Sequence, residues 1–94
     1  MRNTKPRTIP NSLKRYRKAR GLQQKEVAKI LGIKSASMIS RWEKGRCLPS
    51  THHLFRLAVV YRTMVDALYI DVLRASRAHL HKKEERVLKS RKAG

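Results

Sequence analysis

The side chains best suited to recognition chemistry lie close together between residues 36 and 44. Ser37, Ser40, Arg41 and Lys44 are spaced at i, i+3, i+4 and i+7, which places them on one face of a helix. Short hydroxyl side chains allow a helix to approach base edges closely, and Arg41 supplies a longer basic reach. The pattern therefore predicts a helix that reads duplex DNA with its polar face.

Other kinds of site find little support in the sequence. Six acidic residues are scattered, and none belongs to a nucleophile–base pair or a glycine-rich phosphate loop. His52 and His53 are adjacent, so on a helix they point about 100° apart, and no cysteine or carboxylate joins them at ligand spacing. Cys47 is the only cysteine, which excludes an internal disulfide and suits a reducing compartment. We therefore expect no catalysis, no bound metal and no cofactor.

The charge of the chain indicates a polyanionic partner. Twenty-four Lys and Arg residues oppose six Asp and Glu residues among 94, a net charge of +18. Residues 1–20 contain no acid at all, and residues 79–94 are again strongly basic. No apolar run approaches the roughly 18 residues of a membrane span, and the N-terminus lacks the apolar core of a signal peptide. We expect a cytoplasmic, nucleoid-associated protein.

The elements that must position the polar face are helices, because strand-like alternation is absent from the sequence. We expect five helices, over residues 13–20, 24–31, 35–44, 50–61 and from 63 or 64 onward. Gly21, Gly32 and Gly45 are expected to end the first three helices, and Ser35 and Ser50 are expected N-caps. Residues 1–10 are expected to form a flexible basic arm, carrying Arg2, Lys5 and Arg7. The prediction is an all-α chain.

The apolar positions predict which side of each helix is buried. The last helix has a face wide enough to meet the core and a second surface. Leu80 and Val87 continue a seven-residue spacing from Leu73, but Ser76 and Lys83 make this a weak coiled-coil signal. The expected core residues are Val27, Ala28 and Leu31, then Met38, Ile39 and Trp42, then Leu54, Leu57, Ala58 and Tyr61, and in the last helix Val65, Leu68, Tyr69, Val72 and Leu73.

Three stretches carry a resemblance to a known family: "LKRYRKARGLQQKEVAKILG", "MISRWEKG" and "LPSTHHLFRLAVVYRTMVDAL". They resemble the lambda-repressor/Cro-like (Xre-type) helix-turn-helix transcriptional regulators. The resemblance implies a five-helix lambda-repressor-like DNA-binding domain over residues 11–68. An arm over residues 1–10 precedes it, and an extended basic C-terminal helix with a tail over residues 69–94 follows it.

The resemblance also implies a role for individual residues. Arg17 and Glu43 match a structural ion pair of the family. The segment 33–35 is one residue longer than the commonest turn, so which side chain meets a base is left open. The implied base-reading residues are Ser35, Ala36, Ser37, Ser40 and Arg41. The implied phosphate-binding residues are Gln24, Lys25, Lys34, Lys44 and Arg46.

The function implied is that of a small transcriptional regulator, in the first place a repressor. Family members commonly dimerise on palindromic operators in double-stranded DNA, and the wide apolar face of the last helix is the expected interface. One alternative is an antitoxin or adaptor whose C-terminal helix binds a protein partner. Another is a nonspecific RNA-binding protein for which the charge alone suffices, although charge alone would not explain the placement of Met38, Ile39 and Trp42.

Overall fold

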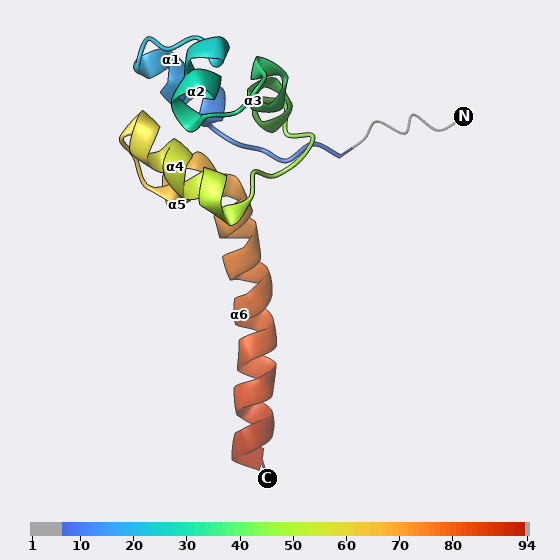
Figure 1. Cartoon of the computed structure of the whole chain (residues 1–94). Helices are drawn as coiled ribbons and strands as arrows, with labels where there is room; N and C mark the ends of the chain where they lie inside the picture. Colours follow the sequence, from blue (N-terminus) through green and yellow to red (C-terminus); the bar gives the residue numbers. More distant parts are fainter. Residues whose placement is uncertain (1–6, 94) are drawn as a thin grey trace, which may run out of the picture.

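The computed structural model describes the backbone of residues 7–93 and the side chains of residues 7–91. Arg2 and Lys5 of the predicted arm lie outside the described residues. Six α-helices follow one another in the described part of the chain, which contains no strand (Figure 1). They are α1 (Leu13–Ala19), α2 (Gln24–Leu31), α3 (Ala36–Glu43), α4 (Thr51–Tyr61), α5 (Val65–Leu68) and α6 (Ile70–Ala93).

Local signals in the sequence set the boundaries of α2, α3 and α4. The backbone N–H of Gln23 donates to Glu26 Oε1 at 2.8 Å at the start of α2, and Gly32 ends that helix in the left-handed conformation with φ +74°. Ser35 and Ser50 cap α3 and α4, accepting from the backbone N–H groups of Ser37 and His53. These boundaries confirm the expected caps.

A single core joins the first five helices. It forms because each helix turns its apolar stripe inward, and α2 and α3 pack against one another most extensively. Ile39 and Trp42 of α3 are 1% and 3% exposed, which confirms their expected structural role. The other buried apolar residues are Leu13, Val27, Ala28, Leu31, Leu57, Ala58, Tyr61, Leu68 and Tyr69.

Met38 was predicted in this core, and that prediction is wrong. Its side chain is 39% exposed. Helix α3 has only eight residues, and Ile39 and Trp42 occupy its inward direction. Met38 lies one helical position to the side, where it borders a surface groove instead. Leu54 of α4 is likewise only half-buried against the core.

Periodicity predicted one continuous helix from residue 63 or 64 onward, and that prediction is wrong, because the structure has two helices there, α5 and α6. The all-α fold with five helices before residue 69 and a C-terminal helix after it is the one that the family resemblance implied. Tyr69 breaks the helix with φ −131° and ψ 43°. The carbonyl of Leu68 accepts a hydrogen bond from the backbone N–H of Ser12 at 2.9 Å, which diverts it from a continuous helical ladder. The break lets Leu68 and Tyr69 both enter the core, 0% and 7% exposed. Most of the apolar face expected to meet a partner is therefore used within the chain.

Helix α6 leaves the globular part on the side of α4 and α5 and points away from α1, α2 and α3 (Figure 1). Among its described side chains, only Ile70, Val72 and Leu73, in the first turn, are half-buried. Every described side chain from Arg74 to Arg91 is exposed. None of the described helices is both long and apolar enough to cross a membrane.

Candidate nucleic-acid interface

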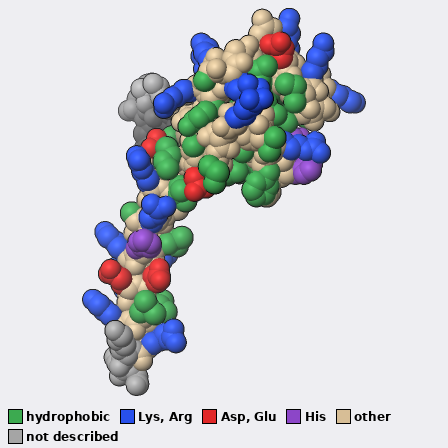
Figure 2. Space-filling model, turned by 90° about the vertical axis from the view of Figure 1, so that its left-hand side faces the viewer, with side chains coloured by type: hydrophobic (Ala, Val, Ile, Leu, Met, Phe, Trp, Pro, Cys, Tyr) green, Lys and Arg blue, Asp and Glu red, His purple; other side chains and the backbone are tan. Residues whose placement is uncertain are grey.

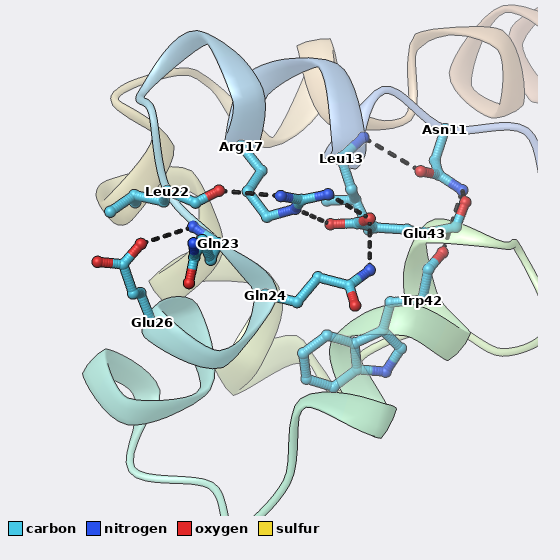
Figure 3. A network of polar contacts seen from close by, with 9 residues as sticks. All are labelled: Asn11, Leu13, Arg17, Leu22, Gln23, Gln24, Glu26, Trp42 and Glu43. Carbon is cyan, nitrogen blue, oxygen red and sulfur yellow. Dashed lines mark hydrogen bonds and ion pairs between the residues drawn. The ribbon is translucent and has the colours of Figure 1, made fainter.

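A buried ion pair fixes the end of α3 to α1. Arg17 Nε donates to Glu43 Oε2 at 2.6 Å, and Arg17 Nη2 donates to Glu43 Oε1 at 3.2 Å (Figure 3). Arg17 Nη1 also donates to the carbonyl of Leu22 at 2.9 Å. The two charged side chains are only 10% and 4% exposed. This bidentate geometry restricts how far α3 can rotate relative to α1.

The same carboxylate holds the start of α2. Gln24 Nε2 donates to Glu43 Oε1 at 3.0 Å, so one acid joins three helices. The hydrogen bond to Glu43 raises the pKa of Arg17, while burial of the guanidinium acts in the opposite direction. The guanidinium of Arg17 therefore keeps its charge throughout the range of ordinary pH. The side chain of Gln24, expected at a phosphate, is engaged here within the protein.

Asn11 provides a second clamp on the end of α3. Its Nδ2 donates to the carbonyls of Ile9, Trp42 and Glu43 at 3.0, 3.1 and 3.3 Å, and its Oδ1 accepts from the N–H of Leu13. Figure 3 draws these contacts in part; the acceptors of Trp42 and Glu43 lie in the last turn of α3, where a helix has fewer N–H donors than carbonyl groups. Asn11 is not among the site residues predicted from the sequence.

The chain before α1 is tied down next to this clamp. The N–H of Ile9 donates to the carbonyl of Gly45 at 2.8 Å, and Ile9 is half-buried. A methyl group at Gly45 would overlap the backbone of Ile9, so glycine permits the close approach. The predicted flexible arm therefore has an anchored end at Ile9, while Arg7 is exposed.

Opposite the clamped side, α3 presents a polar surface to solvent. Ser37, Arg41 and Lys44 are exposed, and Ala36 and Ser40 are half-buried between this surface and the core. Ser35 Oγ accepts from the N–H of Ser37 at 3.1 Å and lies 2.9 Å from its hydroxyl. The extra turn residue thus leaves Ser35 as the cap of α3, with its hydroxyl engaged locally.

Basic side chains border the polar surface of α3. They come from the start of α2, the turn before α3 and the loop after it, and all of them are exposed. The N–H of Arg46 donates to the carbonyl of Arg41 at 3.0 Å, which orders the start of that loop. The bordering residues are Lys25, Lys34, Lys44 and Arg46.

A groove of about 480 Å³ lies beside the N-terminal end of α3 and was not predicted from the sequence. Its walls include Ile33, Met38 and Leu48, and the rings of His53 and Trp42 lie next to one another, tilted by 44° with their centroids 5.4 Å apart. Leu48 is 58% exposed. A large apolar residue in a loop, outside every predicted core stripe, is the signal that could have indicated this groove.

Comparison with known proteins agrees with this arrangement. The helix-turn-helix family model HTH_3 matches residues 13–67, more than half of the chain, which include the helix pair α2–α3. No curated protein and no solved structure gives a match. A clamped helix whose exposed face is polar and bordered by basic residues is what this family presents to double-stranded DNA. The chain belongs to the Xre/lambda-repressor-like helix-turn-helix family and is a DNA-binding protein of the regulator type.

Proposed function

We propose that this protein is a sequence-specific transcriptional repressor that inserts α3 into the major groove of its operator. The observation that carries the proposal is the division of α3 into two faces. Ile39 and Trp42 are buried, whereas Ser37, Arg41 and Lys44 are exposed on the opposite side. A rigidly held helix can place such side chains at base edges with a defined register.

The register proposed here favours the residues after the cap. Ser35 uses its hydroxyl to cap α3, so Ala36, Ser37, Ser40 and Arg41 are the better candidates for base contacts. Small side chains at the start of α3 allow close approach, and Arg41 is long enough to make a bidentate contact with guanine.

Phosphate contacts are proposed for the basic residues that border α3. Lys25, Lys34, Lys44 and Arg46 are exposed around it, and the N-terminus of α2 adds unpaired N–H groups and a favourable dipole. Gln24 is proposed to act mainly by position, because its amide joins α2 to Glu43. Such contacts orient a protein on duplex DNA without distinguishing sequences.

Repression is proposed because a protein that occupies a promoter excludes polymerase by its bulk alone. Two copies on a palindromic operator would place two α3 helices about 34 Å apart, one turn of the duplex. Because both half-sites must match at that spacing, two copies bound together distinguish sequences better than one short helix does.

Selection of bound sequences from random duplexes tests sequence specificity. We expect a palindromic motif, and Arg41→Ala should lower affinity by about 1–3 kcal/mol and relax the preference at one position of each half-site. Lys44→Ala is the matched variant, one turn further along the same helix face, and should weaken all sequences alike. Selection that returns no motif, or equal losses for Arg41→Ala on every duplex, would contradict the proposal.

The salt dependence of binding provides a separate check on the phosphate contacts. If about six phosphates are neutralised, log K should fall with log salt with a slope of about −5. Lys34→Ala and Arg46→Ala should each reduce the slope by about 1. A slope near zero would remove the phosphate contacts from the proposal.

A second candidate function rests on α6. Leu80, Val87 and Leu88 are 56%, 60% and 44% exposed on a helix whose described side chains beyond the first turn are all exposed. This exposure favours an antitoxin or adaptor that holds a protein partner on α6. Coexpression with the product of a neighbouring gene tests this candidate: Leu80→Ser with Val87→Ser should abolish copurification while DNA binding persists.

A further inference from the structure

An exposed apolar surface lies away from the polar face of α3. We call it the α4 surface, and it consists of Ile30 in α2, Phe55 and Val59 in α4, and Met64 after α4. These side chains are 56%, 60%, 76% and 71% exposed. Figure 2 shows hydrophobic side chains gathered over the globular part, with Lys and Arg side chains around its edge and along α6. Contiguous exposed apolar residues of this size are typical of an interaction surface.

The α4 surface is also poor in charge, in a chain that is rich in it. Helix α4 contains one charged residue, Arg56, together with His52 and His53. The whole chain carries +18. Two copies of such a chain repel one another wherever basic surfaces meet, so a face with little charge is the one on which they can approach closely.

The α4 surface has both a ridge and grooves. Phe55 and Val59 are four residues apart on α4 and form a ridge along it. A groove of about 380 Å³ lies on either side of the ridge. One groove is bounded by Ile30 and the other by Met64, and both share Phe55 and Val59 as a wall. The ridge of one copy can therefore enter a groove of a second copy, and a two-fold axis makes the contact reciprocal.

We propose that the α4 surface is the homodimer interface of this protein, with α4 packed against α4 of a second copy. The proposal deepens the proposed function, because a palindromic operator needs two copies, but its solution test needs no DNA. It replaces the interface predicted on the last helix, where Leu68 and Tyr69 lie in the core. Helix α6 is a poorer surface for a second copy, because Lys82, Lys83 and Arg86 would bring like charges together.

Sedimentation of the full chain over a range of concentrations tests the interface. We expect a reversible dimer, favoured by added salt, which screens the net charge and leaves apolar contacts intact. Val59→Lys should raise the dissociation constant by at least tenfold. Leu80→Lys, a matched change of an exposed apolar residue on α6, should leave it unaltered. The fluorescence of Trp42 checks that both variants keep the fold.

A cross-linking experiment keeps the proposal testable should Val59→Lys disturb folding. With Cys47 replaced by serine, Val59→Cys should join two copies through a short bis-maleimide, whereas Leu80→Cys should not. The proposal is overturned if the wild type is a monomer at every concentration, if Val59→Lys sediments like the wild type, or if Leu80→Lys alone dissociates the dimer. A dimer that Val59→Lys dissolves stands even when random duplexes yield no motif, so the two proposals fail separately.

Discussion

Replacing Glu43 by alanine should destabilise the fold more than any change on its surface. The substitution leaves the guanidinium of Arg17, 10% exposed, with the carbonyl of Leu22 as its remaining partner, and it also releases the amide of Gln24. Removing one member of a buried ion pair costs about 3–5 kcal/mol. The total stability of a domain of this size is about 5–10 kcal/mol, so about a third or more of it is lost.

Urea unfolding measured by the fluorescence of Trp42 provides the assay, because this single tryptophan is 3% exposed in the core. A loss of about 3–5 kcal/mol corresponds to a Tm lowered by roughly 12–40 °C in a domain of 60–100 residues. Glu84→Ala removes a carboxylate from the exposed part of α6 and serves as the control, with an expected change within about 0.5 kcal/mol.

A double variant separates the two contributions to this loss. Arg17→Met combined with Glu43→Leu replaces the ion pair by apolar side chains, and it should recover much of the stability that Glu43→Ala loses. The reasoning is refuted if Glu43→Ala costs less than about 1 kcal/mol. It is equally refuted if the double variant is as unstable as the sum of the two single substitutions.

Three further changes test individual features of the fold by the same assay. Burial raises the pKa of Tyr69 to about 12. The stability that comes from keeping this hydroxyl protonated is complete below the unfolded pKa of about 10 and is lost as the pH rises from 10 to 12. Tyr69→Phe should therefore make the free energy of unfolding fall less steeply over this pH range. Because the Tyr69 hydroxyl is buried without a protein partner among the described residues, this variant should also be up to about 1 kcal/mol more stable at pH 7. Gly45→Ala should cost about 1–3 kcal/mol more than Gly21→Ala, since both glycines have positive φ but a methyl group meets backbone only at Gly45. Arg62 ends α4 with φ 53°, so Arg62→Gly should raise the free energy of unfolding by about 0.5–1 kcal/mol, and an unchanged value would contradict the strain inferred there.

The sequence predicted those parts of the fold that depend on neighbouring residues. Gly32, Ser35 and Ser50 mark helix ends because their roles in capping are local, and the structure places them at those ends. The burial of Ile39 and Trp42 also follows from helical periodicity alone. These features suffice to place the polar face of α3, and hence the candidate site.

The features that escaped prediction depend on contacts between residues far apart in the chain. The break at Tyr69 accompanies a hydrogen bond from Ser12 to Leu68, which no local pattern reveals. Periodicity put Met38 on the inward side, but whether an element covers that side is a property of the assembled helices. The amide of Gln24 can donate to a phosphate or to a carboxylate, so its residue type does not decide between them. The packing of α2 on α3 brings this amide within 3.0 Å of Glu43.

The free length of α6 determines how the protein can be handled. Its 24 residues span about 36 Å, and the radius of gyration is 17.4 Å where a compact chain of this length has about 12 Å. Such an elongated molecule tumbles anisotropically and elutes earlier from a sizing column than its mass indicates. A fluorophore or a surface linkage near the end of α6 would sit far from α3, so the protein can be immobilised there with its helix-turn-helix still facing solution.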